Sequence, residues 1–440
     1  KKSGNKISLR KGNTMHLKTK FDYKSIPQNT LFNTRFMISL DAPRGENKNR
    51  KPLNISMVLD RSGSMHGEKL EYVKQAAATL VRQLGSSDTI SLTSFDDEVT
   101  SVIFPGPCSS DNTAESLIAG IQSGGCTNLS GGYQQGIQYA GQSVSDDSIS
   151  RILLLTDGLA NRGIVDPNGI TELVRGALRK GISTTTIGVG FDYNEHLLGV
   201  MAENGSGSTY FIENPDDAPG IFNEELGYLF DLAAQNVKVR FSPSIDGISL
   251  KQLNTYRVEN DGSFSLGDAY GGQEKTLLLE LSMPEVKDTG KLNIGTLTVS
   301  WDDTSGEKMS HETRDIEISI NVVSESEFAR VVPDVDVTLQ AAFLTISRAK
   351  NESIQLADQG RFTEAAELLE DYAQMMEALN LVDARLHDEV MNLRDRARNL
   401  REYGVDFYTP KEKKRMYYEK EMMLKSKMAS YDSMISRRKD

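Results

Sequence analysis

The sequence predicts a multi-domain protein: an α/β unit with a doubly wound, mostly parallel sheet, inserted in an all-β sandwich and followed by an α-helical C-terminal region. Apolar runs alternate with helical segments through residues 51–234, which is typical of a parallel sheet covered on both faces. Short strands separated by turn signals fill residues 235–330, and long helical periodicities occupy residues 331–440. A chain of 440 residues is also too long for one ordinary hydrophobic core.

The α/β unit is predicted from the spacing of its apolar residues. Leu53–Asp60 and Ile152–Thr156 are nearly continuous apolar runs, as expected of central parallel strands. Glu68–Leu84 places its apolar residues on one helical face. We expect further strands at Thr89–Phe95, Val99–Phe104, Ser183–Val189 and Thr209–Ile212, and further helices at Ala114–Ile121, Gly132–Ala140, Thr171–Lys180, Glu195–Glu203 and Ala218–Ala234.

The β-rich part begins near residue 236. Its turn signals include Asp246-Gly247, Asp261-Gly262 and Gly271-Gly272. Residues 1–50 also look extended, and we expect them to join the sandwich. The strand candidates are Met15–Phe21, Arg35–Leu40, Val237–Phe241, Ser249–Leu250, Thr255–Val258, Ser263–Leu266, Thr276–Leu281, Lys291–Trp301 and Arg314–Val323.

The C-terminal part is predicted to be helical. Val335–Ala349, Phe362–Ala378 and Leu381–Tyr403 carry helical periodicity, and the second has a broad apolar stripe. A hairpin resembling part of a tetratricopeptide array is one interpretation, although a single unit does not make an array. Residues 408–440 are basic and polar, and either a loose tail or a partner-dependent helix fits them.

Composition and charge favour a globular protein without a membrane-spanning segment. The 38% of hydrophobic and 25% of charged residues suit a globular chain, and no apolar run is long enough to cross a bilayer. The two cysteines, Cys108 and Cys126, are too few for a disulfide framework, although their pairing stays open. A reducing compartment fits this count best, so we expect a cytoplasmic location. The net charge is −12, yet residues 1–52 hold 13 Lys/Arg against 3 Asp/Glu. Few aromatic residues accompany these charges, so nucleic acid is not the expected partner.

A candidate metal site follows the first apolar strand. Asp60, Ser62 and Ser64 form the pattern Asp-x-Ser-x-Ser between a strand and a helix. Ligands bind at that edge of an open α/β sheet. Carboxylate and hydroxyl oxygens suit a hard divalent cation, and we predict Mg²⁺, with Mn²⁺ or Ca²⁺ as alternatives.

Two further loops offer oxygen ligands to the same edge. Thr127 lies in a glycine-rich loop that begins Gly124-Gly125, and Asp157 ends the apolar strand Ile152–Thr156. A set of two carboxylates and three hydroxyls has low formal charge and cannot enclose an ion. It leaves a coordination position for an outside ligand, and a carboxylate from a partner protein is the natural candidate.

The three motifs MVLDRSGSMHGEKL, GGCTNLSGG and LLLTDGLAN, in this order, resemble the metal-ion-dependent adhesion site of von Willebrand factor A domains. The resemblance is greatest to a bacterial branch related to calcium-activated chloride channel homologues and inter-alpha-trypsin inhibitor heavy chains. It implies a Rossmann-like fold, direct metal ligation by Ser62, Ser64 and Thr127, and contacts of Asp60 and Asp157 through water or hydrogen bonds. It also implies that the last helix, Ala218–Ala234, slides when the site rearranges.

Enzyme interpretations find less support in the residues. His66 is the one histidine near the site, and we interpret it as a rim residue. The stretch DRSGSM lacks the G-x-S-x-G pattern of a hydrolase nucleophile, and the chain has no G-x-x-x-x-G-K-[ST] loop. We therefore predict a non-enzymatic module that binds a partner's Asp, Glu or C-terminal carboxylate through Mg²⁺. A Mg²⁺-dependent hydrolase and a scaffold that binds through its helical C-terminal region are the alternatives. The sequence does not indicate an oligomeric state.

Overall fold

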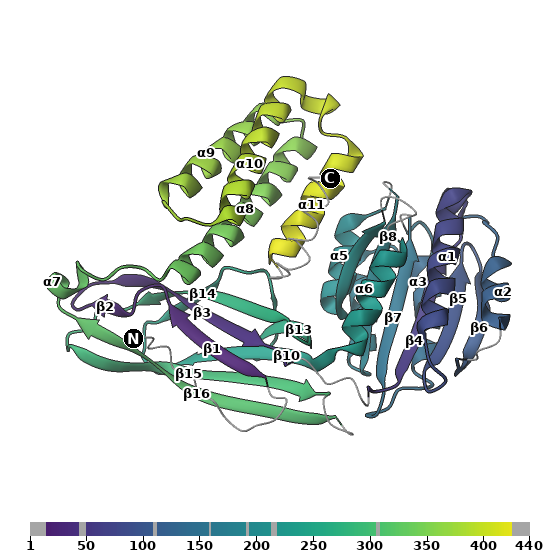
Figure 1. Ribbon diagram of the computed structural model, residues 1–440, viewed down its shortest axis with the longest axis horizontal. Coiled ribbons are helices and arrows are strands. Elements are labelled where there is room, and N and C mark those ends of the chain that lie inside the picture. The colour runs from purple at the N-terminus through teal and green to yellow at the C-terminus, as the bar shows by residue number, and fades with distance from the viewer. Residues whose placement is uncertain are drawn as a thin grey trace.

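The computed structural model describes residues 15–43, 50–108, 112–157, 160–190, 193–212, 218–304 and 309–424. Figure 1 shows three parts: an α/β unit, a pair of β-sheets and a group of C-terminal helices. Parts of three predicted features lie outside these ranges: residues 1–14 and 44–49 of the basic N-terminal segment, Gly158 and Leu159 of the motif LLLTDGLAN, and residues 425–440 of the basic tail.

The α/β unit is built on a six-stranded sheet with the order β6-β5-β4-β7-β8-β9. Only the β5–β6 pair is antiparallel, and the other neighbours run parallel. All residues of β4, β7 and β8 are buried, because helices cover both faces of the sheet. The strands are β4 (Leu53–Asp60), β5 (Thr89–Phe95), β6 (Val99–Pro107), β7 (Ile149–Thr156), β8 (Ile182–Val189) and β9 (Ser206–Ile212).

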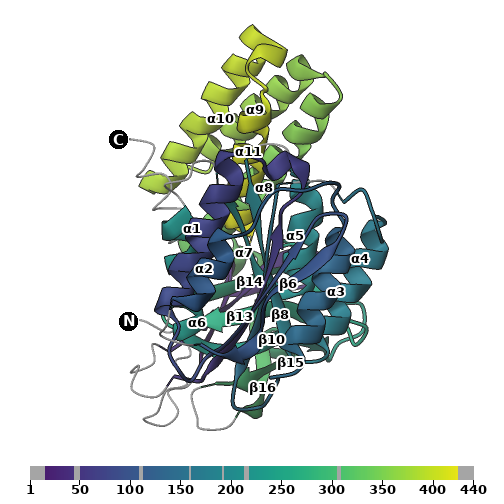
Figure 2. The ribbon, with the colours of Figure 1, turned by 90° about the vertical axis from the view of Figure 1, so that its right-hand side faces the viewer.

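Helices pack on the two faces of this sheet. Figure 2 shows one group on one side and a second group on the other, which confirms the predicted alternation of strands and helices. The first group is α1 (Glu68–Gln83), α2 (Thr113–Ala119) and α6 (Ala218–Phe230). The second group is α3 (Leu129–Ala140), α4 (Pro167–Leu178) and α5 (Glu195–Asn204).

Some predicted helix limits are wrong for identifiable reasons. Helix α4 begins at Pro167 rather than Thr171, because the Asp166 side chain accepts the N–H of Gly169 and caps the helix, with proline at its first position. Helix α6 ends at Phe230 rather than Ala234. The residues after it form β10, because Leu232 and Ala234 pair with Tyr270 and Ala269 of a remote strand.

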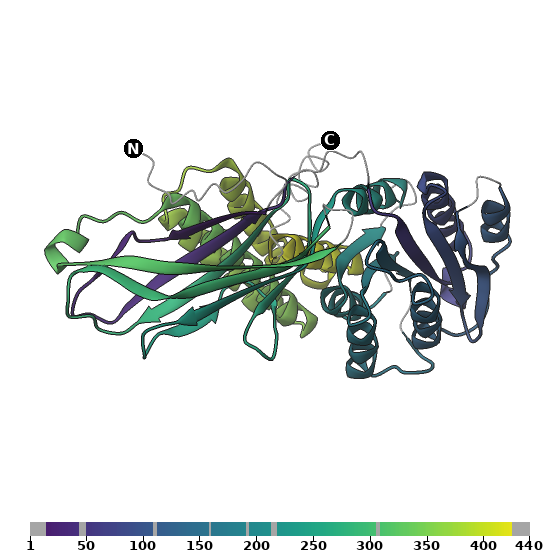
Figure 3. The ribbon, with the colours of Figure 1, turned by 90° about the horizontal axis from the view of Figure 1, so that it is seen from below.

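The remaining strands form two sheets. One has the order β1-β3-β14-β11 and the other β12-β13-β10-β15-β16-β2. Figure 3 shows the purple N-terminal strands running beside the green ones, and strand β3 pairs along its length with β14. The first sheet consists of β1 (His16–Phe21), β3 (Phe32–Asp41), β14 (Glu274–Met283) and β11 (Ser249–Gln252). The second consists of β12 (Arg257–Val258), β13 (Phe264–Tyr270), β10 (Leu232–Pro243), β15 (Gly290–Asp303), β16 (Ser310–Val323) and β2 (Ser25–Pro27).

The two sheets contribute to one apolar core. Phe36 and Leu279 come from the four-stranded sheet, whereas Val239, Val299 and Ile320 come from the six-stranded one. That the α/β unit is an insertion into a β-sandwich, with domain limits at 50/51, 234/235 and 330/331, stays a prediction.

The C-terminal part consists of α-helices. Helix α8 continues to Asp358, beyond the predicted end at Ala349, and residues 410–424 of the predicted basic tail form α11. Among the described residues, no helix is long and apolar enough to span a membrane. The elements are α7 (Glu325–Phe328), α8 (Val335–Asp358), α9 (Phe362–Ala378), α10 (Ala384–Tyr403), η3 (Gly404–Asp406) and α11 (Pro410–Leu424).

A buried group of charged side chains joins α11 to α8 and α10. Lys350 Nζ lies 2.6 Å from a carboxylate oxygen of Glu389 and 3.2 Å from one of Glu419. Arg396 bonds Glu419 at 2.8 Å and Glu412 at 3.1 Å. Buried charges require partners, and these ion pairs tie α11 to α8 and α10.

The opposite side of α11 contacts the α/β unit. Lys414 Nζ donates to the Tyr193 carbonyl at 2.6 Å and to the Glu195 carboxylate at 2.7 Å. Burial raises the pKa of Glu195, but the hydrogen bond and charge of Lys414 outweigh it and hold the pKa below its usual value. Figure 1 shows α11 between the other C-terminal helices and α5. Helix α11 thus bridges the two units.

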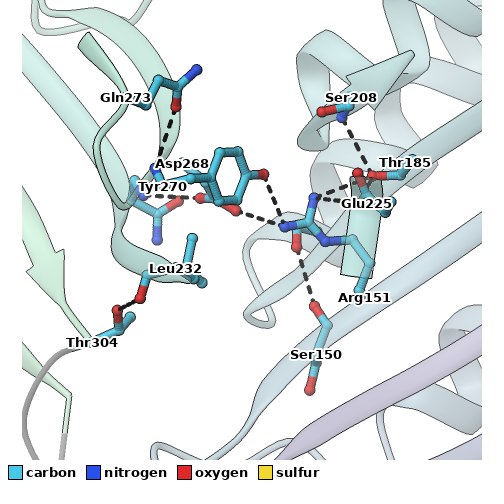
Figure 4. Close-up of polar contacts among 12 residues, drawn as sticks. Ser150, Arg151, Thr185, Ser208, Glu225, Leu232, Asp268, Tyr270, Gln273 and Thr304 are labelled. Carbon is cyan, nitrogen blue, oxygen red and sulfur yellow. Dashed lines mark hydrogen bonds and ion pairs between the residues drawn. The ribbon is translucent and has the colours of Figure 1, made fainter. Parts of the chain in front are cut away.

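A second contact between units centres on Arg151 of β7, which is fully buried. Figure 4 shows its guanidinium facing Asp268 and Tyr270 of β13. The distances are 3.0 Å to Asp268 Oδ2 and 3.4 Å to the Tyr270 hydroxyl. On the other side, Glu225 of α6 lies 3.9 Å away and accepts the Thr185 hydroxyl at 2.6 Å. The network joins the central sheet, α6 and the β-rich part.

The Arg151 network yields a prediction about stability. Arg151→Met should lower the free energy of unfolding by about 3–5 kcal/mol, because it removes the positive charge that faces the buried carboxylates of Asp268 and Glu225. Urea denaturation of the full chain measures this change. The matched control is Arg82→Met, which removes an exposed ion pair with Glu115 and should cost less than about 1 kcal/mol. Equal losses in the two variants would contradict a special role for the buried network.

The strand pairing yields a prediction about domain organisation. Limited proteolysis should cleave near residues 330–335 before it separates residues 15–43 from the β-rich part, because β3 and β14 form one ladder. Val332, in the segment between α7 and α8, is 80% exposed. Mass spectrometry of the early fragments tests the order of cleavage. Early release of an N-terminal fragment would show that these strands are not an integral part of the sheet.

Candidate metal centre

The predicted metal-site residues are brought to one edge by the parallel pairing of β4 and β7. Leu59 is the Cα partner of Leu155, so the two strands end side by side. Asp60 is the last residue of β4, and Asp157 directly follows β7. This is the carboxyl edge of the sheet, where ligands bind in open α/β folds.

The buried Asp60 side chain supports the loop that carries Ser62 and Ser64. It is fully buried, and Oδ1 accepts the Ser62 N–H at 2.8 Å. Oδ2 accepts the Thr156 hydroxyl at 2.5 Å. Burial raises the pKa of Asp60, although these hydrogen bonds oppose the change. Asp60 therefore orients the Ser62 loop and contributes a negative charge in a dry environment.

A chain of oxygen atoms runs across the opening of the site. Ser62 Oγ lies 3.2 Å from Ser64 Oγ, and Ser64 Oγ donates to Asp157 Oδ1 at 2.7 Å. Ser62 and Asp157 are buried, whereas Ser64 is exposed. Asp157 Oδ2 accepts from Lys69 Nζ at 2.6 Å. The structure thus places Ser62, Ser64 and Asp157 together, with Asp60 behind Ser62.

The loop that carries Thr127 lies against the Ser62 loop through its main chain. Gly63 N–H donates to the Gly125 carbonyl at 2.8 Å, and Gly124 N–H donates to the Arg61 carbonyl at 2.7 Å. Thr127 is buried, and its N–H donates to Asn161 Oδ1 at 2.8 Å. The third predicted loop therefore reaches the same edge.

Two residues important for this arrangement were not assigned these roles from the sequence. Asp96, which directly follows β5, is buried. Its carboxylate accepts from Arg61 at 3.0 Å and from Gly125 N–H at 3.2 Å, and it holds the two loops together. Lys69, in the first turn of α1, pairs with Asp157. Asp96 follows a strand that ends at this same edge, which is the one sequence signal for its role.

His66 and the cysteines lie at the margin of the site or away from it. His66 is exposed, and its Nδ1 lies 3.1 Å from the Ser123 hydroxyl, in keeping with the predicted rim position. Cys126 is exposed and Cys108 is buried, and both are free thiols.

The oxygen spacing fits a small divalent cation. Octahedral ligation of Mg²⁺ at 2.0–2.1 Å places neighbouring ligand oxygens about 3 Å apart. The 3.2 Å between the hydroxyl oxygens of Ser62 and Ser64, two of the candidate direct ligands, is close to that spacing. Within the described part of the chain, no group of three or more His, Cys, Asp or Glu side chains gathers as a metal site. Hydroxyl oxygens are therefore essential to the candidate set.

Comparisons with known proteins relate this geometry to a family. Residues 54–224 match the profile of the von Willebrand factor type A domain. The uncharacterized protein sll0103 of Synechocystis sp. is 28% identical over 329 residues, which cover 72% of this chain and 76% of that protein. Inter-alpha-trypsin inhibitor heavy chain H4 of Bos taurus is 32% identical over 176 residues. That alignment covers 38% of this chain and only 19% of the heavy chain.

A solved structure supports the same fold. The von Willebrand factor type A protein from Catenulispora acidiphila superimposes with a TM-score of 0.64, over 86% of this chain and 95% of that chain. The two sequences are 15% identical, so the likeness concerns the fold alone.

The close contact between loops gives a prediction for Gly124. A Cβ built there would lie 1.6 Å from Asp96 Oδ2, so Gly124→Ala must displace the loop or Asp96. We expect the variant to lose about 1–3 kcal/mol of unfolding free energy, measured by urea denaturation in the presence of chelator. Gly120→Ala is the matched control, because its Cβ would meet only main-chain oxygens at 3.5 Å and beyond. A Gly124→Ala variant as stable as the control would show that the loop tolerates a side chain.

Proposed function

The chain contains a von Willebrand factor type A domain over residues 54–224, and on this premise we propose a non-enzymatic interaction module that binds a partner's acidic group through Mg²⁺. The observation that carries the proposal is the oxygen chain Ser62–Ser64–Asp157 at the open carboxyl edge of the sheet. Asp60 stands behind it and holds the Ser62 main chain.

In this proposal the protein residues divide into two groups. Ser62, Ser64 and Thr127 provide neutral hydroxyl oxygens to the ion. Asp60 and Asp157 act through water or by hydrogen bonds to the hydroxyl ligands, as Asp157 does with Ser64. The bound ion supplies an electrophilic position that an outside carboxylate completes. Mn²⁺ and Ca²⁺ accept similar oxygen ligands and are alternative occupants.

The partner group is an exposed Asp or Glu side chain, or a C-terminal carboxylate. The exposure of Ser64 beside the buried Asp157 leaves the site open on the solvent side. A carboxylate is favoured over a neutral group because the ligand set has few negative charges with which to neutralise a divalent ion. Charge complementarity of this kind contributes chiefly to specificity and to the rate of association.

A hydrolytic use of the same ion is less well supported by the geometry. It requires a general base that does not bind the metal and that reaches a metal-bound water. His66 is exposed and faces Ser123, and this contact does not direct it toward Asp157. We therefore propose binding rather than catalysis.

Titration calorimetry with the full chain tests the proposal. Wild-type protein should bind Mg²⁺, while Asp60→Ala and Ser62→Ala should lose measurable binding, because one removes the buried charge and the other a ligand oxygen. Ser116→Ala is a matched control, since its hydroxyl bonds the Asn112 carbonyl in α2, away from the site. Circular dichroism checks that each variant keeps its fold.

The partner is then sought by pull-down with Mg²⁺ or with chelator. We expect capture to require the ion and to fail with Asp60→Ala. If a partner binds equally well after the ion is removed, the metal bridge is wrong. Binding through the C-terminal helices would then take its place.

A further inference from the structure

A lysine lies within the candidate metal centre itself. Lys69 Nζ is 2.6 Å from Asp157 Oδ2, and the Asp157 side chain is fully buried. The lysine stem passes beside the end of β8, where a Cβ built on Gly190 would lie 3.0 Å from Lys69 Cε. The ammonium group is therefore held over the strand ends rather than extended into solvent, with its side chain 29% exposed.

Lys69 and Ser64 use different oxygens of the same carboxylate. Ser64 donates to Oδ1, whereas Lys69 donates to Oδ2. The lysine thus holds the carboxylate with one oxygen directed at the hydroxyl chain, and it places a positive charge next to the proposed ion. Two other arginines near the site pair with different carboxylates, Arg61 with Asp96 at 3.0 Å and Arg162 with Asp97 at 3.9 Å.

We propose that Lys69 strengthens the dependence of acidic-partner binding on the divalent ion. The inference rests on the function proposed above and concerns how that site is regulated. Lys69 acts as a resident cation that weakens the binding of the metal alone and strengthens the binding of a carboxylate once the metal is present.

The argument follows from the formal charges. Asp60, Asp157 and Lys69 together carry one negative charge. A divalent ion changes this to one positive charge, and an incoming carboxylate then brings the site to neutrality. Without Lys69, the two aspartates alone neutralise the ion, and a partner carboxylate would leave an uncompensated negative charge. Because the groups are close together and partly shielded from water, these differences are large enough to measure.

Lys69→Met tests the idea because methionine retains most of the stem and removes the charge. Titration of the full-length variant with Mg²⁺ should give a dissociation constant at least about tenfold lower than that of wild type. Acetate is the carboxylate probe. Its binding is followed by water-proton relaxation of Mn²⁺-loaded protein, and its affinity should fall by about the same factor in Lys69→Met.

Two controls accompany this variant. Lys69→Arg keeps the charge and should restore the wild-type pattern of both affinities. Lys18→Met removes the lysine of another Lys–Asp pair, the 2.5 Å contact with Asp41 in the β-rich part, and should change neither affinity.

Lys69→Met should bind Mg²⁺ more tightly and acetate more weakly, whereas the loss of a merely structural residue would weaken both. If Lys69→Met weakens the binding of both Mg²⁺ and acetate, or if it changes neither affinity, the inference is wrong. If Lys69→Met does not fold, Lys69→Gln, which also removes the charge, is titrated in its place, and the same two opposite changes are expected. If wild-type protein binds no divalent ion, it is the proposed function that fails.

Discussion

The parallel pairing of β4 with β7 is the constraint on which the candidate site depends. It makes Asp60 and Asp157 end neighbouring strands, although 96 residues separate Asp60 from the Thr156 hydroxyl that it accepts. Both strands are buried along their whole length, so their register is set by packing on two faces. Two of the three site loops follow these strands directly, and the third, which carries Thr127, is held against the Ser62 loop by main-chain hydrogen bonds.

Charge placement is the second organising feature. The candidate site combines two buried carboxylates with neutral hydroxyls and one lysine, an arrangement with little excess charge. Asp96 and Arg61 form a separate pair that joins the loops. Such an arrangement is stable before an ion arrives, because each buried carboxylate already has donors. In the proposed function, the affinity for the ion would depend on which of these donors it replaces.

Buried ionic contacts also connect the site to the rest of the chain. Arg151 lies in β7, the strand that leads to Asp157, and it contacts both Asp268 of the β-rich part and Glu225 of α6. The predicted sliding of α6 would have to disturb this network, since Glu225 also accepts from Thr185 and Tyr210. On the same carboxyl edge, α11 holds Tyr193 and Glu195 at the start of α5. A movement of this edge of the sheet would therefore change contacts with both the β-rich part and the C-terminal helices.

The sequence by itself determined the strands β4 and β7, the alternation of strands and helices, and the three motifs that supply Asp60, Ser62, Ser64, Thr127 and Asp157. These features are readable because apolar periodicity and turn residues act over a few neighbouring positions. Only the tertiary structure decided the roles of Asp96 and Lys69, the early start of β10 and the helix at residues 410–424. Each of these depends on a partner remote in the chain: Gly125 for Asp96, Asp157 for Lys69, Tyr270 for Leu232, and Lys350 for Glu419. Local sequence does not encode such partners, because they meet only when separate elements pack together.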